Sequence, residues 1–196
     1  MDHRIAALMA RIEALHGELD EEIARRAEAF RYRVRGGRVE FDAEMRRRHL
    51  ELRERLGSFL ARSRPLVVLT APVVYSVIVA LVILDLFVTL YQAVCFPVYG
   101  IPRVRRADHI RIDRHQLGYL NGLQKLNCVY CGYANGLISY TREIASRTEA
   151  YWCPIKHATR VEVPHGRYAR FLDYGDGEGF RDGLTAERDR LRREEG

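Results

Sequence analysis

The sequence predicts an all-α protein with one membrane-embedded segment, and three observations support this fold class. Apolar residues recur in steps of three and four in both charged flanks, which is the spacing of amphipathic helices. Residues 66–101 hold one charged side chain, that of Asp85. A C-x2-C pair and a C-x3-H pair lie between residues 128 and 157. The predicted division is an amphipathic helical or coiled-coil region at 1–64, a membrane-embedded segment at 65–102, a metal-binding domain at 103–163 and a charged flexible tail at 164–196.

Positive charge is concentrated beside the apolar stretch. The chain has a net charge of +6, and residues 99–170 hold 12 basic and 5 acidic side chains. A basic segment next to an apolar one favours anionic lipid headgroups over nucleic acid as the partner. We therefore expect no nucleic-acid partner, and we expect headgroup contacts from Arg103, Arg105, Arg106 and Arg111.

The N-terminal region predicts two helices. Residues 3 to about 33 have near-heptad apolar spacing, at Ile5, Leu8, Ile12, Leu15, Leu19, Ile23 and Phe30. Gly36-Gly37 interrupts this pattern, and V-R-G-G-R-V favours a small β-turn and a helix–helix connection about equally. Asp42 predicts the cap of a second helix, with one face formed by Met45, His49, Leu52, Leu56 and Phe59. The two helices form either an antiparallel hairpin or a short coiled coil, through which we expect a homo-oligomer or a protein partner.

The apolar stretch is long enough to be embedded in a membrane. Residues 66–84 alone approach the roughly 20 residues that cross a hydrocarbon core. One model is a single helix from about Pro72 to Val94, and the other is a tight re-entrant hairpin that turns near Asp85. We favour the single helix, because no Gly, Pro or Asn lies at the proposed turn. Seven arginines precede the stretch and five follow it within 20 residues, so the positive-inside rule does not orient it.

Asp85, Thr89 and Gln92 share one face of such a helix at i, i+4 and i+7. A polar stripe at membrane depth normally faces protein or water. It marks either an interface with a partner helix or an acid that lies close enough to the membrane surface to be hydrated.

After the membrane helix, the sequence predicts one short strand and then two helices. Residues 103–112 suggest one short strand at the membrane surface, and Asp113 with Gln116 predicts a capping box for a helix through about Leu126. A second helix begins near Asn135, with a Glu143–Arg147 pair on its outer side. Residues 165–183 are rich in Gly and Asp, which predicts a loop or a disordered tail.

The cysteines predict a metal site formed by Cys128, Cys131, Cys153 and His157. A C-x2-C turn aims two thiolates at one ion, and the C-x3-H pair supplies the other two corners of a tetrahedron. We expect zinc, with iron or an iron–sulfur cluster as the alternative. Since all four ligands come from the protein, such a site stabilises a fold and leaves no open position for catalysis. Signatures of nucleotide-binding, hydrolase and zinc-protease sites are absent from the sequence.

The runs D-R-H-Q-L-G-Y-L-N-G-L-Q-K-L-N-C-V-Y-C-G-Y-A-N-G and E-I-A-S-R-T-E-A-Y-W-C-P-I-K-H-A together resemble a family of bacterial membrane-associated proteins that carries no established activity. The likeness covers roughly residues 70–160. The ligand types are also similar to those of the [2Fe–2S] mitoNEET class, but the C-x-C start and C-D-G-x-x-H end of that class are missing.

These observations predict a membrane-anchored adaptor or assembly protein without catalysis of its own. We expect it at the bacterial inner membrane, because the resemblance implies bacteria. We expect its metal domain in the cytoplasm, because thiolate ligands need a reducing compartment. The alternative is a redox or electron-transfer protein in which the same four residues hold an iron–sulfur centre or cycle as thiols.

Overall fold

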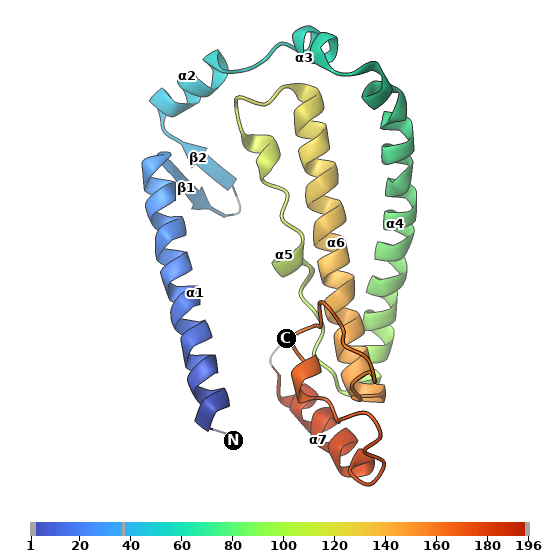
Figure 1. Ribbon diagram of the computed structural model, residues 1–196. Helices are drawn as coiled ribbons and strands as arrows, with labels where there is room; N and C mark the ends of the chain where they lie inside the picture. Colours follow the sequence, from blue (N-terminus) through green and yellow to red (C-terminus); the bar gives the residue numbers. More distant parts are fainter. Residues whose placement is uncertain (1–2, 37, 195–196) are drawn as a thin grey trace. The chain divides into compact units, whose positions relative to one another are not determined.

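The computed structural model describes residues 3–36 and 38–194, apart from the side chains of residues 3–6, 8, 9 and 13. As predicted, the described chain is mostly helical (Figure 1). The helices are α1 (His3–Ala29), α2 (Ala43–Glu51), α3 (Leu56–Arg62), α4 (Pro65–Tyr99), α5 (Arg106–His109), α6 (Gly122–Trp152) and α7 (Phe180–Arg193). Two short 3-10 helices (Arg114–Gln116, Tyr168–Arg170) and a hairpin of β1 (Tyr32–Arg35) and β2 (Arg38–Phe41) complete the described elements.

The chain forms two compact units. Unit 1 is Met1–Arg62 with Asp113–Asn127, and unit 2 is Ser63–Ile112 with Cys128–Gly196. This division differs from the predicted one, because residues 113–127 pack with the N-terminal region instead of with a metal domain. Helix α6 begins in unit 1 and continues through unit 2.

In unit 1 a β-hairpin, not a helix–helix connection, follows α1. Strands β1 and β2 pair antiparallel, with Tyr32 opposite Phe41, and Gly36 has a positive φ of 54° that suits the turn. Gly37 and the side chains of Ile5 and Leu8 lie outside the described residues. Because the hairpin of β1 and β2 lies between α1 and α2, the predicted helical hairpin is wrong. Helix α1 has an exposed apolar stripe at Ile12, Leu15, Leu19 and Ile23. An oligomer formed through this stripe stays a prediction.

Asp42 caps α2 as predicted, because its Oδ1 accepts from the backbone N–H of Met45 at 2.8 Å. The predicted second helix, however, is interrupted between α2 and α3. Arg53 in the interruption donates from Nε to the carbonyl of Gly118 at 2.9 Å, so a contact distant in sequence holds the break.

The predicted capping box at Asp113 is also wrong. Gln116 instead uses its Oε1 to accept from the N–H of Val39 at 2.8 Å, and only one 3-10 turn forms. The capping pair of α6 is Asn121 with Gln124, which exchange backbone-to-side-chain hydrogen bonds at 2.9 and 3.0 Å. Helix α6 therefore begins later than predicted and runs without a break past Asn135.

Helix α4 is continuous, so the tight re-entrant hairpin is not formed. Its 35 residues span about 52 Å at 1.5 Å per residue, and it is long and apolar enough to cross a membrane. Pro65 suits the first turn, and Gly100 ends the helix with a positive φ of 69°. The helix extends beyond the predicted bounds at both ends.

In unit 2 the chain reverses direction after α4 (Figure 1), and the returning segment, residues 101–112, bonds to α4 through Val104 with Gln92 and Arg106 with Asp85. Helices α4 and α6 lie side by side in the same direction, since Tyr130 contacts Val74 and Thr148 contacts Tyr91. The core of this unit contains Phe96, Ile101, Val104, Leu137, Tyr140, Ile144, Ala150, Phe171 and Leu191. Residues 103–112 form the single helical turn α5 and no strand.

Residues 164–194 are not a flexible tail. Helix α7 is amphipathic, and its Leu191 is completely buried in the core of unit 2 with Phe171. The Gly- and Asp-rich composition predicted a loop, but it covers only the turns that precede α7.

Candidate functional site

Asp85 is the centre of a polar cluster on α4. Its Oδ2 lies 2.6 Å from Nη2 of Arg106, and its Oδ1 lies 3.4 Å from Nε of the same guanidinium. The phenol of Tyr133 on α6 donates to Oδ2 at 2.9 Å, and Thr89 donates to Oδ1 at 3.3 Å. The Asp85 side chain is 16% exposed. One carboxylate on the apolar helix thus joins α4, α5 and α6.

Gln92, two turns further along α4, makes a second polar contact. Its Oε1 accepts from the N–H of Val104 at 2.9 Å, and its Nε2 donates to the Val104 carbonyl at 3.3 Å. The same Nε2 donates to Tyr140 OH. A side-chain amide therefore satisfies both backbone groups of Val104, as a neighbouring strand would. Gln92 fixes the returning segment against α4.

The polar stripe of Asp85, Thr89 and Gln92 lies on α4, where Asp85 and Gln92 bind residues of the same chain. Its predicted role was contact with a partner helix or with water. Arg106, Tyr133, Val104 and Tyr140 occupy it instead. A stripe on one helix does not reveal which later residues reach it, so sequence reasoning missed Arg106 and Tyr133 as partners of Asp85.

The cluster holds Arg106 and Tyr133 in their protonated forms. The hydrogen bond with Asp85 raises the pKa of Arg106. Burial, followed by the hydrogen bond to Asp85, raises the pKa of Tyr133. Both residues donate to Asp85, and the arrangement links α5 and α6 to α4.

Gly136 allows the returning segment to approach α6. A Cβ at this position would lie 2.7 Å from Cα of Ile110 and 2.8 Å from the carbonyl of His109, and backbone atoms at that distance cannot give way cheaply. His109 Nδ1 lies 2.9 Å from Ser139 Oγ one turn further along.

A second polar cluster joins α6 to α7. Arg147 is buried and bonds to Glu143 at 2.9 Å and to the Pro102 carbonyl at 2.6 Å, so the Glu143–Arg147 pair is not on the outer side of α6 as predicted. Arg167 bridges Glu143 and Glu194. Burial raises the pKa of Glu194. Hydrogen bonds from Arg167 and Arg170 lower this pKa by more than burial raises it, so the pKa of Glu194 lies below its ordinary value.

The structure does not bring the four predicted metal ligands together. Cys128 and Cys131 are within α6, whereas Cys153 follows its last residue. The helical rise places Cys131 about 33 Å from Cys153 along the axis. No group of three or more His, Cys, Asp and Glu among the described residues is arranged to hold a metal ion. A single ion bound by Cys128, Cys131, Cys153 and His157 of one chain would require α6 to break.

The spacing predicted a knuckle because C-x2-C occurs in tight metal-binding turns, but the same spacing also fits one helix turn. All four cysteines are free thiols. Burial, together with the nearby Glu149 carboxylate, raises the pKa of Cys153. Zinc binding, and the iron or iron–sulfur alternative, stay predictions that metal analysis of purified protein can test.

The four arginines that were predicted to contact lipid headgroups divide into two pairs. Arg106 binds Asp85, and Arg103 donates to the Ala93 carbonyl at 3.0 Å. Arg105 and Arg111 are exposed, and Arg105 has a long contact of 3.8 Å with Asp108. Among the described residues Arg105 and Arg111 donate no hydrogen bond to α4, so their guanidinium groups stay available for headgroups.

No family model, curated protein or solved structure matches this chain.

Proposed function

We propose that this protein is a membrane-anchored adaptor that performs no chemistry of its own, with α4 as its anchor. The observation that carries the proposal is the exposure of α4. None of the most apolar 18-residue window of this helix is buried within the chain. The exposed side chains include Val79, Val82, Ile83, Leu86, Phe87, Leu90 and Val94.

Water is a poor environment for this surface. Burial of a Val, Leu, Ile or Phe side chain contributes about 1.5–3 kcal/mol, and soluble monomers rarely expose contiguous apolar patches above a few hundred Å². A helix that is apolar around its whole circumference requires cover on every side. The returning segment and α6 cover one side of α4, and lipid covers the remainder.

The polar clusters support the adaptor part of the proposal. Asp85 and Gln92 bind residues of the same chain, so they fix a protein module to the anchor. The exposed helix α1 and the arginine-rich α2 would serve protein partners. Arg105 and Arg111 would contact anionic headgroups.

We propose the bacterial inner membrane as the location, with the part of unit 2 that follows α6 on the cytoplasmic side. The resemblance to bacterial membrane-associated proteins supports the membrane. The exposed free thiol of Cys153, which follows α6, supports the compartment, because a reducing cytoplasm keeps such a thiol reduced. A redox function that uses Cys128, Cys131, Cys153 and His157 together has less support. The continuous helix α6 separates the first two residues from the last two.

Flotation with neutral phosphatidylcholine vesicles tests the anchor. The purified protein should float with the vesicles and stay bound through high-salt and carbonate washes, because apolar insertion is not screened by salt. Recovery of the wild type in the washed soluble fraction would reject the proposal.

A matched pair of variants locates the contact. Leu86→Arg introduces a charge on the exposed face of α4, at a cost of roughly 2.5–3.5 kcal/mol if that position lies near the bilayer centre. Leu60→Arg makes the same change at an exposed leucine of α3. Leu86→Arg should weaken flotation and Leu60→Arg should not; equal effects would place the contact elsewhere.

A further inference from the structure

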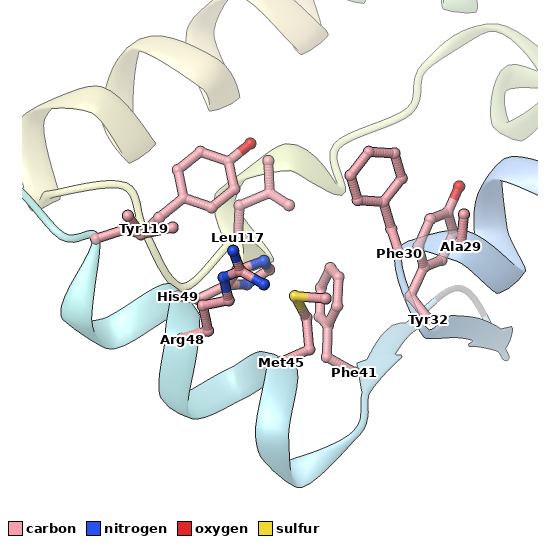
Figure 2. A pocket seen from close by; sticks show the side chains of 10 residues that line it. Ala29, Phe30, Tyr32, Phe41, Met45, Arg48, His49, Leu117 and Tyr119 are labelled. Carbon is pink, nitrogen blue, oxygen red and sulfur yellow. The ribbon is translucent and has the colours of Figure 1, made fainter.

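Unit 1 contains a cavity of about 600 Å³ between the end of α1, the β-hairpin, α2 and the segment before α6. Small-molecule sites usually have volumes of about 300–1,000 Å³. Figure 2 shows Phe30 and Tyr32 across the hollow from the side chains of α2, with Leu117 and Tyr119 along another wall. The lining residues are Ala29, Phe30, Tyr32, Phe41, Met45, Arg48, His49, Leu52, Leu117 and Tyr119.

Aromatic contacts shape one wall of this cavity. The ring of Phe41 lies 5.7 Å from that of Tyr32 and 4.7 Å from that of His49, and His49 lies 5.1 Å from Tyr119. These ring pairs meet at 52°, 69° and 85°. None of these three contacts is a parallel stack, so the aromatic wall that they form is not flat. A flexible acyl chain can follow such a wall, because its methylene groups pack against ring edges and ring faces alike.

The charge of the lining is one-sided. Arg48 is its permanent cation, and no carboxylate lines the cavity. Among the described residues Arg48 has no ion-pair partner, whereas nearby Arg31 is paired with Glu44 and Asp42. A cation at an apolar cavity without a counter-ion favours an anionic ligand group.

We propose that this cavity binds an acyl chain whose anionic head pairs with Arg48. The chain lies against the aromatic wall and Met45, and the carboxylate or phosphate accepts hydrogen bonds from the guanidinium. The ligand is either a free fatty acid or an anionic phospholipid, which share this chemistry. The inference rests on unit 1 alone and does not depend on α4 as a membrane anchor.

Photolabelling tests the site in the full chain, reconstituted in nanodiscs of neutral phosphatidylcholine. The probe is palmitate with a diazirine on its chain, and labelled peptides are mapped by mass spectrometry. Labels are expected around Phe30 to Met45 and around Leu117 to Tyr119. Unlabelled palmitate should compete for these peptides and hexadecanol, which lacks the charge, should not. Competition by phosphatidylglycerol but not by palmitate would identify the phospholipid as the source.

Two variants separate binding from folding. Arg48→Gln should weaken labelling of unit 1 roughly tenfold through the loss of a charged hydrogen bond. Arg47→Gln, which changes the adjacent arginine outside the lining, should leave it unchanged. Leu117→Trp should block labelling by filling the cavity while Arg48 stays intact. The proposal is overturned if only α4 is labelled, if hexadecanol competes as well as palmitate, or if both Arg48→Gln and Leu117→Trp label like the wild type.

Discussion

The ion pair between Asp85 and Arg106 predicts an asymmetric response to substitution. Arg106→Leu leaves a carboxylate that is mostly buried, with Tyr133 and Thr89 as its donors. We expect this change to cost about 2–3 kcal/mol, because an unpaired buried charge is more costly than a lost neutral hydrogen bond. Asp85→Asn keeps an acceptor for Tyr133. Because the Arg106 side chain is 48% exposed and can turn to water, we expect a cost of about 1 kcal/mol.

Hydrogen exchange measured by mass spectrometry in nanodiscs reports these costs, since the pair holds the returning segment 101–112 and local opening controls exchange there. The double variant, Asp85→Asn with Arg106→Leu, should lose about 1 kcal/mol less stability than the two single variants added together. Asp108→Asn is the control, because its 3.8 Å contact with Arg105 is exposed and contributes little. Exchange in Arg106→Leu equal to that in Asp108→Asn, or strictly additive single costs, would refute the assigned link.

Three further predictions follow from the packing and titration of unit 2. Gly136→Ala should destabilise the protein by about 1–3 kcal/mol through overpacking, whereas Gly122→Ala, with open space around it, should not; thermal unfolding in nanodiscs compares them. Because the pKa of Glu194 lies below its ordinary value of 4.5, its ion pairs stabilise α7 above pH 4.5. Hydrogen exchange in α7 of the wild type should therefore become less protected as the pH falls through the lowered pKa, whereas Glu194→Gln should lack this pH dependence. Because Glu149 helps to raise the pKa of Cys153, Glu149→Gln should speed alkylation of Cys153 near pH 8; an unchanged rate would contradict this assignment.

Local patterns in the sequence predicted two features of the local structure correctly. The cap at Asp42 and the continuous apolar helix were correct, because caps and long periodic segments depend on neighbouring residues. The capping pair of α6 at Asn121 and Gln124 has the same form as the one predicted at Asp113, but tertiary contacts of Gln116 decided between them.

Contacts between distant residues were beyond the sequence patterns. Nothing near Asp85 indicates that Arg106 returns to it, and nothing near Glu194 indicates its pairing with Arg167. The metal prediction depended on a break between Cys131 and Cys153, and the spacing alone does not distinguish a turn from a helix. The segment after Gly136 continues the helix, so the four ligands stay apart.

The most direct test of the lipid-covered anchor is a scan of single spin labels along α4 in nanodiscs, in a background without native cysteines. Accessibility to oxygen, which dissolves in lipid, and to a water-soluble nickel complex is measured at each position. Labels at Val82, Leu86 and Leu90 should be accessible to oxygen and shielded from nickel, while labels at Val88 and Phe96 should be shielded from both, with a helical period. Nickel accessibility at the first three positions equal to that of exposed sites on α3 would contradict the account.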